Sequence, residues 1–151
     1  MSLDGVVFSH GGRTVLDGVD LDLHAGELVM LAGASGAGKS TLSYLAAGLL
    51  EPDAGTVRVC GHAARPGMVG VAVQQPEGQF FHDTVFDEVA FAPRNAGFDE
   101  SEVRVLVERS IGAVGLPVDV LERSPCELSG GQARRVAIAS VIALDAPAYI
   151  F

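Results

Sequence analysis

Residues 33–41 form the stretch whose residue types and spacing best predict chemistry. They are Gly33, Ala34, Ser35, Gly36, Ala37, Gly38, Lys39, Ser40 and Thr41. The spacing of Gly33, Gly38, Lys39 and Ser40 satisfies the P-loop pattern, in which backbone amides surround phosphate groups. The glycines, with Gly36, allow positive φ angles and a close approach of the main chain to an anion. Lys39 is predicted to reach the β- and γ-phosphates, and the Ser40 hydroxyl to ligate the Mg²⁺ that bridges them.

The elements on either side of this stretch agree with that interpretation. The apolar run 27–32 before it predicts a strand buried on both faces of a parallel sheet. Leu42, Leu45, Ala46 and Leu49 after it recur at helical spacing, so a helix is expected up to residue 50, with its positive end toward the anion. The alternative is a glycine-rich turn that only joins a strand to a helix.

A second pattern lies at the start of a later predicted helix. Its residues are Leu128, Ser129, Gly130, Gly131 and Gln132. The Ser129 side chain and the amides of the two glycines are predicted to form a second anion-binding site at a helix N-terminus. The alternative is a serine N-cap with glycines that allow a tight bend.

The remaining pattern indicates an α/β protein with an antiparallel layer and a helical insertion. Strands are expected at 6–8, 19–23, 55–61, 68–73 and 148–151. Thr84 and Asp99 are expected to cap two helices, the first interrupted by Pro93 and the second ended by Gly115. Residues 80–125 are therefore interpreted as a helical subdomain inserted in the α/β core of a single domain over 1–151.

Charge and cysteine content narrow the class of protein. The formal net charge is −9 and the arginines are scattered, which argues against a nucleic-acid partner. Cys60 and Cys126 have no metal or Cys-x-x-Cys spacing, which is typical of a reducing compartment. We expect no signal peptide, and no apolar run approaches the length of a membrane span, so any membrane connection is expected to go through a partner.

Together these motifs resemble the nucleotide-binding domain of ABC ATPases. The run 128–132 is similar to the signature pentapeptide of that family, and Gln74 stands at the place of its Q-loop glutamine. The runs 74–81 and 84–95 most resemble the ATPase subunits of energy-coupling-factor importers. The resemblance implies a P-loop NTPase fold of the ABC ATPase type.

It also implies ATP and Mg²⁺ as cofactors and a head-to-tail dimer, in which ATP lies between the P-loop of one subunit and the signature of the other. Gln74 is expected to act with Lys39 in catalysis and to contact the metal or the attacking water. The open alternative for Gln74 is a polar loop over two core aromatics. His10 stands where the family has an adenine-stacking aromatic residue, although a plain surface histidine is an equal alternative.

The partners implied are a second ABC ATPase subunit and a transmembrane subunit that docks near residues 74–81. The protein is then expected at the cytoplasmic face of the cell membrane as a peripheral subunit.

The resemblance breaks at the end of the sequence. The family's Walker B strand ends in an aspartate and a glutamate, and here the run 149–151 is followed by neither. The chain is therefore interpreted as an N-terminal fragment, truncated within that strand, that binds nucleotide without hydrolysing it. The alternatives are a regulatory module that never hydrolyses ATP and a soluble ABC ATPase outside transport.

Overall fold

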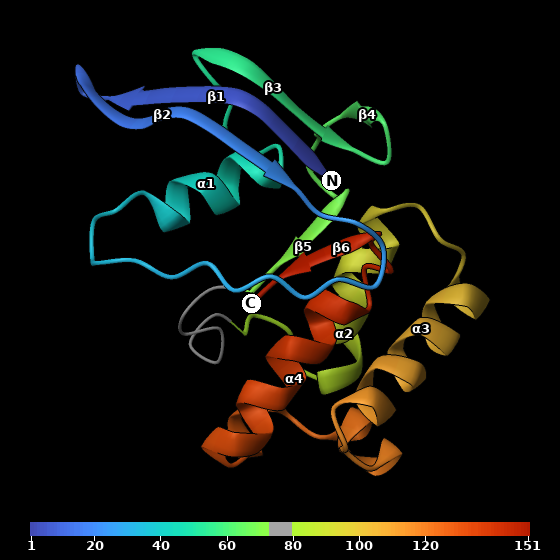
Figure 1. Cartoon of the computed structure of the whole chain (residues 1–151). Coiled ribbons are helices and arrows are strands. Elements are labelled where there is room, and N and C mark those ends of the chain that lie inside the picture. The colour runs from blue at the N-terminus through green and yellow to red at the C-terminus, as the bar shows by residue number, and fades with distance from the viewer. Residues whose placement is uncertain (73–79) are drawn as a thin grey trace. The chain divides into compact units, whose positions relative to one another are not determined.

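An antiparallel sheet is built from the first strands of the chain, as the sequence predicts. In the computed structural model, which describes residues 1–72 and 80–151, β1 (Ser2–His10) and β2 (Arg13–Asp22) form a hairpin. Strands β3 (Ala54–Val59) and β4 (His62–Ala63) extend it in the order β2-β1-β3-β4, with every pair antiparallel (Figure 1). The predicted antiparallel layer is confirmed.

Helix α1 (Lys39–Ala46) packs against this sheet. Leu42 and Leu45 from the helix join a core cluster with side chains from the sheet, which are Leu3, Val6, Leu16 and Val57. The helix is shorter than predicted, because Ala47 caps it and Gly48 turns away at φ +68°. Leu49, predicted to continue the helical repeat, is consequently exposed.

The predicted buried strand at 27–32 is wrong for the described part of the chain. These residues form no ladder with any described strand, and Leu28 and Met30 are 99% and 88% exposed. An apolar run becomes a buried strand only when neighbours bond to both of its edges and cover both of its faces. No described segment supplies those neighbours here.

Within the described residues 70–72 and 80–151, three α-helices and two short 3₁₀ helices make up most of the chain. They are α2 (Val85–Asn95), α3 (Glu100–Ala113), η2 (Val118–Glu122), η3 (Pro125–Glu127) and α4 (Gly130–Ile142). Thr84 and Asp99 cap α2 and α3 as predicted. Pro93, predicted to interrupt α2, lies inside it instead, in its last turn.

The helices share one apolar core. Its buried members are Val85, Val89, Ala90, Val103, Val107, Ile111, Leu116, Val120, Leu121, Val136, Ala139 and Ala143. Strands β5 (Val69–Val71) and β6 (Ala148–Ile150) pair as a separate two-stranded sheet. Gly70 permits the ring of Tyr149 to lie across β5, because a Cβ at position 70 would be 2.6 Å from Tyr149 Cδ1.

The chain divides into two units, one made of residues 1–69 with Ile150 and the other of residues 70–149 with Phe151. The P-loop pattern belongs to the first unit and the second glycine pattern to the second unit. Among the described helices, none has the length and apolar character needed to cross a bilayer.

Candidate functional site

The side chain of Lys39 closes the loop that precedes α1. Its Nζ donates to the carbonyl oxygens of Gly33 and Ala34, both at 2.8 Å. An ammonium group has three N–H donors, so one proton of Lys39 remains for a ligand after these two bonds. The loop is thereby held in a curve by the same cation that is expected to bind phosphate.

Two of the three glycines in this loop are required by the backbone. Gly36 and Gly38 have φ angles of +80° and +88°, a conformation that side chains with a Cβ rarely adopt. Gly38 is also confined, because a Cβ there would lie 3.0 Å from Leu16 Cδ2 and 3.2 Å from the Val15 carbonyl oxygen. Gly33 is not at positive φ, contrary to the prediction, and its carbonyl instead accepts from Lys39.

The N-terminus of α1 has a charge pattern suited to an anion. Gly38 provides no side-chain cap, and the first turn carries no acidic residue. By contrast, the first turns of α2 and α3 carry two acidic residues each. Acidic side chains offset the positive end of a helix. Although the chain has a net charge of −9, no acidic residue in the first turn of α1 offsets the positive N-terminal end of that helix, which can therefore face an anion.

Ser129 and Gln132 form a capping box at the start of α4. Ser129 Oγ accepts from the Gln132 amide at 3.3 Å, and Gln132 Oε1 accepts from the Ser129 amide at 3.0 Å and from Ser129 Oγ at 3.1 Å. The serine N-cap is therefore present. A capping box and an anion site can coexist, because the box occupies the amides of residues 129 and 132 and not those between them.

Gly130 and Gly131 lie between the two capping residues and face open space. Both are exposed, neither is at positive φ, and a Cβ on either would meet nothing within 4 Å. Nothing in the local structure of this turn therefore requires glycine. The first turn of α4, like that of α1, carries no acidic residue.

The remaining predicted site residues are His10, Ser40, Thr41 and Gln74. His10 is exposed at the end of β1, paired with Arg13 across the hairpin. Ser40 and Thr41 belong to the first turn of α1, with Ser40 exposed and Thr41 half-buried. Gln74, predicted to act in catalysis and to contact metal, lies outside the described residues.

An aromatic cluster follows directly after the undescribed segment. Phe81 is 65% exposed, and the centre of its ring lies 4.3 Å from that of His82 and 5.0 Å, edge to face, from that of Phe91. Glu88 on α2 is only 8% exposed, and its Oε2 accepts from the amides of Phe81 and His82 and bonds His82 Nδ1, each at 3.1 Å. Glu88 thus fixes the backbone that presents Phe81.

The described residues contain no group of three His, Cys, Asp or Glu side chains that could hold a metal. Mg²⁺ in phosphate-binding proteins is commonly held by one or two protein oxygens together with the phosphates of the nucleotide. The hydroxyl of Ser40, next to Lys39, provides one such oxygen. The described residues therefore fit a Mg²⁺ that arrives with a nucleotide, and among them no set of side chains fits a metal held by protein ligands alone.

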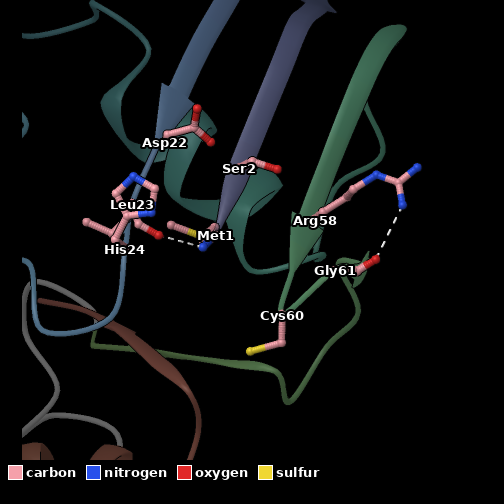
Figure 2. A pocket seen from close by; sticks show the side chains of 8 residues that line it. All are labelled: Met1, Ser2, Asp22, Leu23, His24, Arg58, Cys60 and Gly61. Atoms are coloured by element: carbon pink, nitrogen blue, oxygen red, sulfur yellow. Dashed lines mark hydrogen bonds between the residues drawn. The ribbon is translucent and has the colours of Figure 1, made fainter.

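A shallow pocket of about 140 Å³ at the ends of β2 and β3 contains none of the predicted site residues (Figure 2). The Met1 amino group there donates to the Leu23 carbonyl at 2.7 Å, and Arg58 donates to the Gly61 carbonyl at 3.3 Å. Both cationic groups that line the pocket are therefore already bonded to backbone oxygen. The pocket plays no part in the function proposed below.

Sequence reasoning missed two contributors to these sites. The spacing Ser-x-x-Gln is a known capping-box signal and could have identified the partnership of Ser129 with Gln132. The bonds of Glu88 to residues 81 and 82 had no such signal, because they depend on a loop folding back over the first turns of α2.

Comparison with known proteins identifies the family. The model of the family described as ABC transporter matches residues 16–151. The energy-coupling factor transporter ATP-binding protein EcfA2 of Thermotoga maritima is 46% identical over 136 residues, which are 86% of this chain and 50% of that protein. EcfA1 of Mycoplasma pneumoniae is 36% identical over 157 aligned positions, covering 99% of this chain and 57% of that protein. The chain thus spans about half the length of these relatives.

Solved structures agree on the fold. The structure of cbiO1 from Clostridium perfringens, part of the ABC transporter complex cbiONQ, has a TM-score of 0.82 at 26% identity and covers 96% of this chain and 61% of its own. The ATP-binding cassette MJ0796, solved as a dimer in a post-hydrolysis state with ADP and Pi, has a TM-score of 0.79 at 25% identity, covering 98% and 71%. The ABC ATPase fold expected from the motifs is confirmed.

Proposed function

We propose, from the premise that the chain belongs to the ABC transporter family, that it is the ATP-binding part of an energy-coupling-factor transporter ATPase. The observation that carries the proposal is the pair of hydrogen bonds from Lys39 Nζ to the carbonyls of Gly33 and Ala34. They lie at the N-terminus of α1, whose first turn has no acidic residue. We further propose that the protein of the relatives' length hydrolyses ATP to drive uptake of a solute. Residues 1–151 are then the N-terminal part of an ABC domain, with the helical subdomain at 80–125.

In this proposal the loop 33–41 surrounds the phosphates of ATP. The remaining proton of Lys39 bonds the β- and γ-phosphates, while the amides at the start of α1 face the anion. Ser40 supplies the protein oxygen for a Mg²⁺ that enters with the nucleotide. A bound Mg²⁺ contributes charge that offsets the triphosphate, and the protein contributes position.

The second nucleotide contact is proposed to come from another ATPase subunit. Ser129, Gly130, Gly131 and Gln132 lie in the unit that does not contain the loop 33–41, on an exposed helix start with room for a ligand. MJ0796 was solved as a dimer with ADP and Pi. A head-to-tail dimer that encloses ATP between the two glycine patterns accounts for both.

Two further contacts are proposed from sequence position alone. His10 is exposed and presents an imidazole that can stack on adenine. Gln74 is proposed to contact the Mg²⁺ or the attacking water, and through it to act with Lys39 in catalysis.

The membrane partner is proposed to dock near residues 74–81. The described end of that stretch supports this, because an exposed aromatic ring held by a buried carboxylate is an anchor of the kind that protein interfaces use. The related cbiO1 is part of a transporter complex. The protein is accordingly proposed to be peripheral, at the cytoplasmic face of the cell membrane.

Calorimetric titration with MgATP tests the nucleotide site. The chain is expected to bind MgATP, and Lys39→Ala to weaken binding about 10- to 100-fold, because a hydrogen bond to a charged group contributes about 1.5–3 kcal/mol. Arg58→Ala is the matched control, since it removes one positive charge from the same unit, and among the described residues the Arg58 side chain bonds the Gly61 carbonyl alone. Equal affinities of the Lys39→Ala variant and the unaltered chain would refute the proposal.

A further inference from the structure

A β-bulge fixes the start of β2 against the N-cap of α1. The register between β1 and β2 shifts by one residue at Val15, which has no partner on β1. Bulges of this kind re-aim side chains that would otherwise alternate between the two faces of a strand. Val15 and Leu16 accordingly both reach one point, because a Cβ at Gly38 would lie 3.1 Å from Val15 Cγ1 and 3.0 Å from Leu16 Cδ2. The start of β2 therefore packs beside the phosphate loop (Figure 1).

The hairpin turn lies directly beyond this contact. Residues 11–12 form the turn, and His10 pairs with Arg13 across it. Directly opposed residues of an antiparallel pair have their side chains on the same face of the sheet. His10 shares its face with Phe8, two residues earlier on β1, and Phe8 packs on the core cluster to which α1 contributes. His10 and Arg13 therefore both belong to the face of the hairpin that carries α1.

Arg13 is an exposed cation close to the phosphate loop. Two residues of strand, at most about 7 Å, separate it from Val15, which packs on the N-cap of α1. Arg13 makes no ion pair with another residue that the structure describes. By contrast, Arg94 and Arg109 are each paired with a carboxylate at 2.9 Å or less. Arg13 thus presents a planar cation that no described residue neutralises.

Two kinds of ligand group suit a guanidinium at this place. A phosphate needs its charge, whereas a purine ring needs its plane, on which it stacks. The imidazole of His10 and the guanidinium of Arg13 are two flat groups side by side, with Cβ atoms about 5 Å apart in a directly opposed pair. A purine has two fused rings and can cover both groups at once. The pairing therefore favours the base over the phosphates, which Lys39 and the amides of the loop 33–41 already serve.

We propose that Arg13 and His10 form one platform for the adenine base of ATP, with the guanidinium of Arg13 stacked on the purine beside the imidazole. A cation over the face of an aromatic ring is attracted by its π electrons. The stack on His10 belongs to the proposed function, and the assignment of Arg13 goes beyond it. The inference rests on that function, because it needs ATP in the loop 33–41.

Calorimetric titration of the full chain with MgATP tests the platform. Arg13→Ala is expected to weaken binding about three- to tenfold, as for a cation–π contact that is partly desolvated. Arg13→Lys keeps the charge but lacks the plane, so its affinity is expected to stay close to that of Arg13→Ala. Arg58→Ala removes a positive charge from β3 of the same sheet and is expected to bind as the unaltered chain does.

Each outcome decides the inference. Weaker binding in both Arg13 variants, beside an unchanged Arg58→Ala, supports it. Full affinity in Arg13→Lys overturns it, because a phosphate contact needs the charge alone, and so does full affinity in Arg13→Ala. An equal loss in Arg58→Ala also overturns it, since the loss then follows net charge. If the unaltered chain binds no MgATP, the proposed function itself fails, whereas a loss in Lys39→Ala without one in Arg13→Ala removes the platform and leaves that function standing.

Discussion

Two constraints, the backbone conformation and close packing, require glycine at position 38, whereas the backbone conformation alone requires it at position 36. Both residues lie at positive φ, a conformation that costs a residue with a Cβ about 1–2 kcal/mol. Only at Gly38 would the added Cβ also press on Val15 and Leu16, at 3.0–3.2 Å, while at Gly36 it would meet nothing within 4 Å. The two positions therefore separate backbone strain from packing within one loop.

Gly38→Ala is predicted to destabilise the chain by about 1 kcal/mol more than Gly36→Ala, the size of a small overpacking penalty. Equilibrium unfolding in urea, followed by circular dichroism, measures both variants against the unaltered chain. Gly36→Ala is the matched control for the strain. Equal losses of stability in the two variants would show that crowding of the added Cβ against Val15 and Leu16 of β2 contributes nothing to the loss in Gly38→Ala.

At the scale of residues, the sequence predicted the phosphate loop but not how it is held. The spacing of Gly33, Gly38, Lys39 and Ser40 is a local pattern, so one sequence suffices to find it. The bonds from Lys39 to two carbonyls depend on the curvature of the whole loop, which no single residue type encodes.

Arg94 makes three side-chain contacts, of which the one with Glu100 joins α2 to α3. Its guanidinium bonds Asp87 at 2.9 Å and Glu100 at 2.8 Å, and it lies 5.6 Å from the centre of the Phe86 ring. Arg104 on α3 lies over the same ring at 5.3 Å but has only a 3.7 Å pair with Glu108. Arg94 is thus a bridge between helices, whereas the ion pair of Arg104 stays within one helix.

Arg94→Ala is predicted to lower the free energy of unfolding by about 1 kcal/mol, the upper end for exposed ion pairs. Arg104→Ala, the control, is predicted to lower it by about 0.3–0.5 kcal/mol, as expected for a pair within a helix. Urea unfolding at neutral pH gives both values. A larger loss in the Arg104→Ala variant would contradict the role of Arg94 as the bridge.

The contribution of Arg94 is expected to depend on pH. Hydrogen bonds from Thr84 and then Arg94 lower the pKa of Asp87, and the hydrogen bond from Arg94 lowers the pKa of Glu100. A carboxyl whose folded pKa is below its unfolded value stabilises the fold above the unfolded pKa, about 4, and loses that effect as pH falls through the folded value. The stability gap between the chain and its Arg94→Ala variant should therefore narrow below about pH 4. A gap that stays constant down to pH 2 would contradict this.

At the scale of elements, caps were predictable and sheet neighbours were not. Thr84, Asp99 and Ser129 begin helices where the sequence places them, because a cap acts within four residues. The run 27–32 was predicted as a strand, yet it is exposed, because a strand depends on partners far away in sequence. Pro93 was predicted to interrupt α2, yet it lies in the last turn of that helix, so a residue that usually ends a helix is tolerated there.

For the whole molecule, the central claim is that one ATP is enclosed by two copies of the chain. The two glycine patterns belong to different units, and each begins a helix with no acidic residue in its first turn. The chain has an overall charge of −9, and acidic residues occupy the first turns of α2 and α3. The first turns of α1 and α4 differ from these in having none. The sequence predicted both patterns, and their shared purpose stays a proposal.

Mixing two inactive variants tests that claim most directly. Lys39→Ala disables the phosphate loop, and Gly131→Asp places a carboxylate where the side chain has room but a phosphate would be repelled. Neither variant alone should dimerise with MgATP, whereas an equal mixture should, since one shared site is then intact. The readout is sedimentation of the mixture with and without MgATP. Recovery of a dimer only in the mixture is the predicted result, and a mixture that stays monomeric, beside an unaltered chain that dimerises, would contradict the account.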